Sequence, residues 1–176
     1  GKSTTTRLID AGLRNCNLKV FSKTTGTIPT MINSNNQDIV IKRLGKANIR
    51  EQIKILRKAA KENVDVLVLE CMAVNPELQK ICEEKILKAN ITVITNVRMD
   101  HIKEMGNSLE ELAQALSLTT PSNGKLIVNN SEFNDLFLKE TKKKNSQLIV
   151  AKEYDENEDL DTFKDNIAIA LEVSRQ

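Results

Sequence analysis

The sequence predicts an α/β fold: a mostly parallel β-sheet with helices on both faces, in the three-layer arrangement of phosphate-loop proteins. Two observations predict it. Short apolar runs typical of buried strands alternate with longer segments of helical periodicity, which implies helical crossovers between parallel strands. The chain also opens on Gly1-Lys2-Ser3, the second half of a phosphate-binding loop, which normally follows a strand. We therefore expect the first strand to lie before residue 1, and residues 1–176 to form a single domain.

Aliphatic and β-branched runs bounded by polar residues predict the strands. The compact run Val64–Leu69 is typical of a buried parallel strand. The segment 24–46 is rich in glycine, proline and asparagine, so it is predicted as a long loop with one edge strand. We place the strands at Leu18–Phe21, Ile39–Ile41, Val64–Leu69, Ile91–Thr95, Leu126–Asn129 and Leu148–Val150.

Apolar spacing and helix-start residues predict the helices. Ile49, Ile53, Leu56 and Ala60 share one face of a helix over 48–62. A proline is favoured as the first residue of a helix, and Ser108 with Glu111 nearly completes a capping box. We place the helices at Thr4–Arg14, Asn48–Glu62, Pro76–Ala89, Ser108–Leu118, Ser131–Lys144 and Asp165–Arg175.

Composition excludes several classes of protein. The net charge of +2 predicts no strong attraction to nucleic acid, and 3% aromatic residues leave little for base stacking. No apolar run approaches the ~20 residues that a membrane-spanning helix needs. Three cysteines without metal-ligand spacing are typical of reduced thiols in a cytosolic compartment.

The opening residues are the first candidate site. In the motif G-x-x-x-x-G-K-S/T, glycine lets backbone N–H groups approach a phosphate, lysine neutralises the outer phosphates, and the hydroxyl binds Mg²⁺. Gly1, Lys2, Ser3 and Thr4 would supply these groups at a helix N-terminus, whose dipole favours anions. The triplet alone is equally compatible with a simple capped helix.

Polar residues follow each predicted strand, at the edge where parallel α/β sheets bind ligands. Each has a structural alternative: a carboxylate can cap a helix, a threonine can be an ordinary loop residue, and a single histidine is more often a structural hydrogen-bonding group. The candidates are Thr24, Thr25, Gly26, Glu70, Asn96, Asp100, His101, Asn129 and Asn130.

Four ordered blocks resemble a known family: Gly-Lys-Ser-Thr-Thr-Thr at 1–6, Lys-Thr-Thr-Gly-Thr at 23–27, Glu-Cys-Met-Ala-Val-Asn-Pro-Glu at 70–77, and Asn-Val-Arg-Met-Asp-His-Ile-Lys-Glu-Met-Gly at 96–106. Together they are similar to the ligase subunits of poly-γ-glutamate synthases, within the Mur ligase and folylpolyglutamate synthetase superfamily. The resemblance extends over essentially the whole chain and implies the central ATPase domain.

The resemblance implies roles at the phosphate end of the site. Lys2 matches the phosphate-loop lysine, Ser3 the Mg²⁺-binding hydroxyl and Glu70 the acidic Mg²⁺ ligand. Thr24, Thr25 and Gly26 match the loop that borders the phosphates and the metal.

Further residues match the family at the acyl and nucleoside ends. Asn96 with Asp100 and His101 matches a block whose histidine serves a second metal near the acyl substrate. Asn129 and Asn130 resemble a segment close to the adenosine. Asp165-Asn166 weakly resembles another nucleotide block, in which histidine precedes the asparagine.

Two departures from the family stand out. Many Mur ligases hold the second metal through a carbamylated lysine after the histidine, but the corresponding segment Leu112–Leu118 contains no lysine. The family also carries a C-terminal domain for the incoming amino acid, which this sequence is too short to include.

The resemblance implies an ATP-dependent carboxylate–amine ligase that uses ATP and Mg²⁺, with one or two metal ions. A glutamate polymer would be activated as an acyl phosphate and attacked by the amine of glutamate. Implied partners are the poly-γ-glutamate chain and membrane-associated synthase subunits on the cytoplasmic face, reached through an upstream anchor or those subunits, and a homo-oligomer is possible. A switch ATPase, a Mur-type ligase with another acceptor and a non-catalytic nucleotide-binding scaffold remain alternatives.

Overall fold

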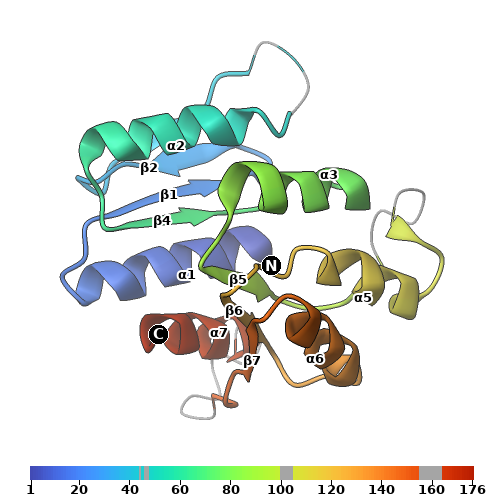
Figure 1. Ribbon diagram of the computed structural model, residues 1–176. Coiled ribbons are helices and arrows are strands. Elements are labelled where there is room, and N and C mark those ends of the chain that lie inside the picture. The colour runs from blue at the N-terminus through green and yellow to red at the C-terminus, as the bar shows by residue number, and fades with distance from the viewer. Residues whose placement is uncertain (44, 46–47, 100–104, 155–163) are drawn as a thin grey trace. The chain divides into compact units, whose positions relative to one another are not determined.

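The structure is a computed structural model that describes residues 1–43, 45, 48–99, 105–154 and 164–176 (Figure 1). Its residues form two units. The first contains Gly1–Met72 and Ala170–Gln176, and the second contains Ala73–Ile169. The α/β class predicted from the sequence is confirmed, because helices and strands alternate in both units.

The first unit is built on a mixed four-stranded sheet in the order β3-β2-β1-β4. β1 pairs in parallel with β4 and antiparallel with β2, which in turn pairs antiparallel with β3. Helices α1 and α2 lie on opposite faces of this sheet (Figure 1). The elements are α1 (Lys2–Asn15), β1 (Val20–Thr24), β2 (Thr30–Ile32), β3 (Asp38–Val40), α2 (Glu51–Glu62) and β4 (Val66–Leu69).

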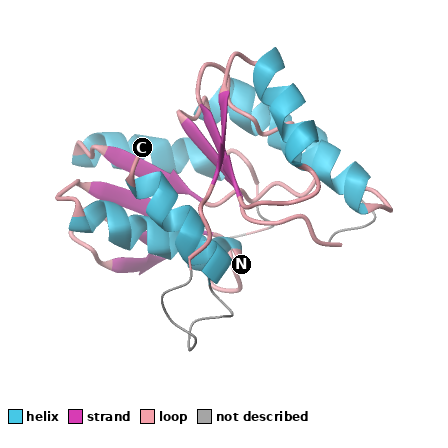
Figure 2. Ribbon diagram, turned by 90° about the horizontal axis from the view of Figure 1, so that it is seen from below, coloured by secondary structure: helices cyan, strands magenta, loops and turns pink. Residues whose placement is uncertain are grey.

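The second unit contains a parallel sheet in the order β5-β6-β7 (strands in magenta, Figure 2). Its elements are α3 (Pro76–Ile81), the π-helical turn η1 (Cys82–Leu87), β5 (Ile91–Ile94), α5 (Leu109–Ser117), β6 (Lys125–Val128), α6 (Asn134–Lys143) and β7 (Gln147–Val150). The last helix, α7 (Lys164–Ser174), contains residues of both units.

Two predicted helix starts, at Pro76 and Ser108, are confirmed by their caps. The side chain of Asn75 accepts hydrogen bonds from the N–H groups of Glu77 and Leu78, and Pro76 follows as the first helical residue of α3. Ser108 accepts a hydrogen bond from the N–H of Glu111 at the start of α5. These side chains satisfy donors that would otherwise have no partner within the helix.

The predicted sheet needs correction. The described strands form two hydrogen-bonded sheets, and the first is mixed. Its antiparallel part depends on β2, which we did not predict because Thr30-Met31-Ile32 is short and lies in a turn-rich segment. All three residues are nevertheless buried. The three-layer arrangement of one sheet and the strand expected before residue 1 stay predictions.

The predicted face of α2 is offset from the buried one. The buried residues are Gln52, Ile55 and Ala59, whereas Ile53 and Leu56 are half-buried and Ala60 is exposed. Periodicity weighs only apolar side chains, so it could not place a glutamine on the inner face. Ile55 and Ala59 pack with Phe21 and Met31 in the core of the first unit.

The core of the second unit yields a stability prediction. Phe137 on α6 is 1% exposed and packs in a cluster with Ile94, Ala113, Leu126 and Val128. Phe137→Ala should lower the free energy of unfolding by about 3–5 kcal/mol, because it removes apolar contacts and leaves a cavity.

The neighbouring Leu138→Ala is the matched control, since Leu138 is 39% exposed on the same helix. Leu138→Ala should lower the free energy of unfolding by well under half as much as Phe137→Ala does. Urea unfolding monitored by circular dichroism measures both values. Equal losses for the two variants would contradict the assigned core.

Candidate nucleotide and metal site

Glu70 is the centre of the candidate site in the first unit. It directly follows β4, is 6% exposed, and its N–H donates to the carbonyl of Lys23 on β1 at 2.9 Å. Its carboxylate Oε2 accepts hydrogen bonds from Ser3 Oγ at 2.7 Å and from the Thr25 N–H at 2.8 Å. Residues from three distant parts of the sequence therefore meet at one carboxylate oxygen.

Gly26 makes room for this contact. A Cβ atom at Gly26 would lie 3.1 Å from Ser3 Oγ, which is tighter than an ordinary contact. The absence of a side chain lets the loop after β1 approach the serine hydroxyl. The sequence placed Gly26 beside the phosphate-loop residues, and the structure brings it to Ser3.

The remaining phosphate-loop residues lie at the start of α1. Gly1 is the N-cap, no acidic residue occurs in the first turn, and the helix is 14 residues long. The partial positive charge of a helix N-terminus is therefore not offset there by a carboxylate of the first turn. Lys2 is exposed, while Ser3 and Thr4 are half-buried.

Thr24 differs from its neighbours in position. It is the last residue of β1, is 3% exposed, and its hydroxyl donates to the Thr30 carbonyl at 3.4 Å. This contact links β1 to β2. A role for Thr24 toward phosphate stays a prediction.

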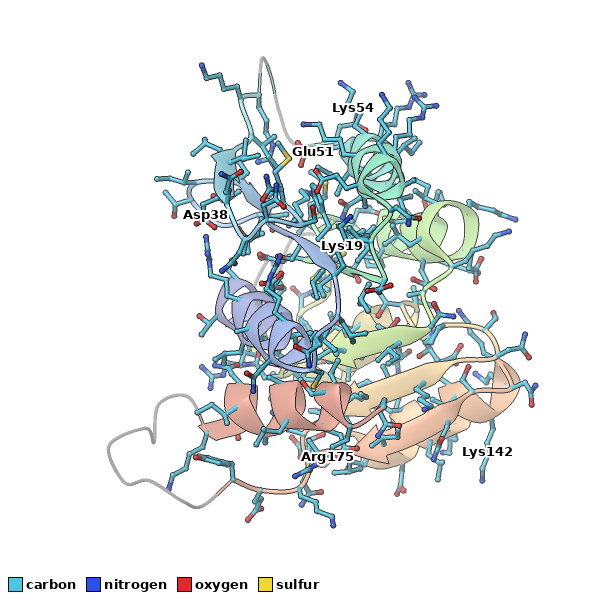
Figure 3. The ribbon with its side chains drawn as sticks, turned by 90° about the vertical axis from the view of Figure 1, so that its left-hand side faces the viewer. Lys19, Asp38, Glu51, Lys54, Lys142 and Arg175 are labelled. Carbon is cyan, nitrogen blue, oxygen red and sulfur yellow. The ribbon has the colours of Figure 1, made fainter. Side chains whose placement is uncertain are left out.

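A buried ion pair lies on the inner side of α2. Lys23, fully buried on β1, places its Nζ 2.8 Å from Glu51 Oε1, and Arg43 Nε is 2.7 Å from Glu51 Oε2. In Figure 3, Glu51 and Lys54 extend from different sides of α2, and Lys54 is exposed. Hydrogen bonds from Arg43 and then Lys23 lower the pKa of Glu51 to about 2, whereas burial lowers the pKa of the Lys23 ammonium.

Gln52 links this ion pair to the candidate site. It is fully buried, its Oε1 accepts from Lys23 Nζ at 3.0 Å, and its Nε2 donates to the backbone carbonyl of Glu70 at 3.2 Å. Gln52 and Glu51 were not predicted from the sequence. A glutamine three residues before Ile55 and seven before Ala59 on an amphipathic helix was the available signal.

The second unit holds the asparagines of the predicted nucleoside end. Asn129 Nδ2 donates to the carbonyls of Thr95 at 3.2 Å and Asp165 at 3.3 Å. A cavity of about 310 Å³ is lined by Asn96, Asn129, Asn130 and Asp165 among others. The structure therefore brings these predicted residues together. Asn166, the residue after Asp165, is buried on α7.

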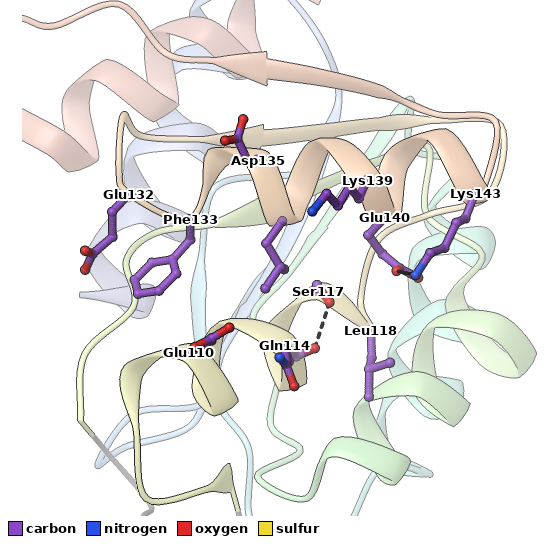
Figure 4. Close-up of a pocket in the computed structure, with 11 residues that line it drawn as sticks. Glu110, Gln114, Ser117, Leu118, Glu132, Phe133, Asp135, Lys139, Glu140 and Lys143 are labelled. Atoms are coloured by element: carbon purple, nitrogen blue, oxygen red, sulfur yellow. Dashed lines mark hydrogen bonds and ion pairs between the residues drawn. The ribbon is translucent and has the colours of Figure 1, made fainter.

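A larger cavity of about 660 Å³ lies between α5 and α6 and contains none of the predicted residues (Figure 4). Glu110 and Gln114 face it from α5, and Lys139 and Glu140 face it from α6 (Figure 4). Asp100 and His101 lie outside the described residues, so their predicted roles stay predictions.

The donor atoms around Glu70 suit a hard cation. Mg²⁺ prefers oxygen ligands, usually one or two carboxylates with water and phosphate oxygens, and Ser3 with Glu70 offers a hydroxyl and a carboxylate. Among the described residues, no group of three or more His, Cys, Asp or Glu side chains could hold a metal ion. Within the same ranges, no helix is both long and apolar enough to cross a membrane.

Comparison with known proteins identifies the family of this chain. The Mur ligase middle domain family matches residues 1–174. The chain is 39% identical to PGA synthase CapB of Bacillus subtilis (strain 168), covering 99% of this chain and 47% of that protein. It is 37% identical to the capsule biosynthesis protein CapB of Bacillus anthracis, covering 99% and 39%. The chain thus spans less than half the length of these relatives.

Solved structures show the same fold at low sequence identity. The FPGS–AMPPCP complex superposes with a TM-score of 0.69 at 15% identity, covering 99% of this chain and 55% of that one. A bifunctional folylpolyglutamate synthase/dihydrofolate synthase with Mn, AMPPNP and L-glutamate bound gives 0.64 at 16% identity, covering 99% and 50%.

The two sheets and their helices define an α/β domain. Within that class, the chain belongs to the Mur ligase family, as its middle domain.

Glu51 yields a prediction about acid stability. Its folded-state pKa of about 2 lies below the ordinary 4.5, so its ion pairs stabilise the fold fully above pH ~4.5. That contribution is lost as the pH falls toward about 2. Glu51→Gln should therefore be less stable than the wild type at neutral pH, and the difference should shrink on acidification.

Urea unfolding at a series of pH values measures this difference. Glu132→Gln, at an exposed position, is the control and should stay near the wild type throughout. A wild-type advantage over Glu51→Gln that is unchanged between neutral pH and pH 2.5 would contradict the ion-pair assignment.

Proposed function

We propose that this chain is the ATP-binding domain of an ATP-dependent amide ligase that joins glutamate units into poly-γ-glutamate. The observation that carries the proposal is the convergence of Ser3 and Thr25 on the Glu70 carboxylate, in a chain 39% identical to a PGA synthase over 99% of its length. The substrates and partners of the whole ligase are part of the proposal.

Four candidate site residues of the first unit have an assigned role. Ser3 and Glu70 supply oxygen ligands for Mg²⁺, which when bound offsets the negative charge of the phosphates. Lys2, exposed at the start of α1, is assigned to the outer phosphates, and the N-terminus of that helix favours their charge. Thr25 holds the Glu70 carboxylate in place through its N–H.

The chemistry follows from the poor reactivity of a carboxylate. An oxygen of the glutamate polymer's carboxylate attacks the γ-phosphorus of ATP, the bond to ADP breaks, and an acyl phosphate forms. The amine of the incoming glutamate then attacks the acyl carbon, phosphate leaves, and an amide remains. The protein contributes mainly position and charge neutralisation.

The second unit is assigned to the nucleoside and the acyl substrate. Asn96, Asn129 and Asn130 around the 310 Å³ cavity support a role toward the nucleoside, with Asn166 on α7. Asp100 and His101 are assigned to a second cation near the acyl group. Further parts of the proposal are membrane-associated synthase subunits at the cytoplasmic face and a homo-oligomer.

Hydroxylamine trapping tests the reaction. The full-length protein with Mg·ATP, a glutamate oligomer and hydroxylamine should yield a hydroxamate together with an equal amount of ADP, because hydroxylamine captures the acyl phosphate. Glu70→Gln should lower the hydroxamate yield about 10- to 100-fold, since it weakens a cation ligand. His101→Ala should lower the yield more than it lowers ATP affinity.

Glu77→Gln is the matched control, because Glu77 lies seven residues after Glu70 and is exposed on α3. It should keep the wild-type yield. ATP hydrolysis that does not depend on the glutamate oligomer, and that gives phosphate without hydroxamate, would contradict the ligase proposal and favour a switch ATPase.

A further inference from the structure

Lys23 places its side-chain amino group in the core of the first unit. Its side chain is 0% exposed, and its Nζ contacts Glu51 Oε1 at 2.8 Å, Gln52 Oε1 at 3.0 Å and Met72 Sδ at 3.5 Å. The three acceptors match the three donors of an ammonium group. Burying a charged group is costly, and replacing a buried ion pair with apolar residues is often neutral or stabilising. Here Lys23 is buried and Glu51 half-buried. Stability of the fold therefore gives little reason for a lysine here.

The lysine and Gln52 form a closed ring of contacts with Glu70. The Lys23 carbonyl accepts from the Glu70 N–H at 2.9 Å, and Lys23 Nζ donates to Gln52 Oε1. Gln52 Nε2 completes the ring by donating to the Glu70 carbonyl at 3.2 Å. Both backbone polar groups of Glu70 are thus held, one by the main chain of β1 and one by a side chain of α2.

The ammonium also fixes which way the Gln52 amide faces. A lysine can only donate, so it requires Oε1 of the amide, and Nε2 is left to face the Glu70 carbonyl. The reversed amide would put an NH₂ group against the ammonium and an oxygen against the carbonyl. Both contacts would then be repulsive. Burial lowers the pKa of Lys23, and the hydrogen bond to Glu51 opposes that effect.

We propose that Gln52, oriented by Lys23, is a positioning residue that sets the Glu70 carboxylate for cation binding. It acts on the backbone of Glu70 while Ser3 and Thr25 act on its carboxylate. The proposal rests on the proposed function of Glu70 as a ligand of the cation. Partners of metal ligands typically change metal affinity by about 10- to 100-fold when they are replaced.

The test is Mn²⁺ binding to the full-length protein with a non-hydrolysable ATP analogue, followed by electron paramagnetic resonance. Gln52→Leu removes both amide contacts and should weaken Mn²⁺ binding about tenfold. Gln52→Glu keeps an acceptor for Lys23 but turns a carboxylate oxygen toward the Glu70 carbonyl. It should weaken binding as well, and it provides a second variant should the leucine variant fail to fold.

Ile55→Ala is the matched control, one turn further along the same buried face of α2 and 3% exposed. It removes core packing without touching Glu70, so its Mn²⁺ affinity should equal that of the wild type at a temperature where all variants are folded. Wild-type affinity in the Gln52 variants would overturn the proposal. An equal loss in Ile55→Ala would also overturn it, because general loosening of the core would then explain the effect.

Hydroxamate yield of the wild type separates this proposal from the proposed function. If the wild type binds Mn²⁺ but yields no hydroxamate, the ligase proposal is contradicted. The Mn²⁺ affinities of the Gln52 and Ile55 variants then decide the positioning role of Gln52. If the wild type yields hydroxamate but the Gln52 and Ile55 variants bind Mn²⁺ equally well, the ligase proposal stands and the positioning role of Gln52 is contradicted. A wild type that binds no Mn²⁺ overturns both.

Discussion

The carboxylate of Glu70 is the point on which the candidate site depends. One of its oxygens accepts hydrogen bonds from Ser3 at the start of α1 and from the backbone of Thr25 after β1. Hydrogen bonds therefore hold together three segments that lie far apart in the sequence. A buried carboxylate tolerates this position only because donors surround it. The same oxygen-rich surroundings suit a hard cation, so one arrangement explains both the local structure and the proposed chemistry.

A polar cluster behind Glu70 adjoins the apolar core between α2 and the sheet, and it explains the buried glutamine on the inner face of α2. Lys23 on β1 contacts both Glu51 and Gln52 of α2. A fully satisfied polar network restrains its members more than apolar packing does, because each hydrogen bond has a required direction. In the proposed function, this network is a rigid support beneath the carboxylate that is assigned to the cation.

Much of the fold was predictable, and the failures share a physical cause. The helix starts at Pro76 and Ser108 and the strand before Glu70 follow from local rules, which the caps confirm. Ser3, Gly26 and Glu70 were predicted at one sheet edge, and the structure brings them together. Short antiparallel β2 and the polar inner face of α2 depend on tertiary contacts. Local propensity carries no signal for partners that are distant in sequence. The burial of Gln52 therefore could not be predicted from the apolar residues of its helix.

The most direct measurement is a double-mutant cycle on the Mn²⁺ affinity of the full-length protein with a non-hydrolysable ATP analogue. The four proteins are the wild type, Ser3→Ala, Glu70→Gln and the double variant. If Ser3 and Glu70 serve the same cation, the loss of affinity in the double variant falls clearly short of the product of the two single losses. Independent, multiplying losses would show that the two residues do not share a site, and would contradict the account.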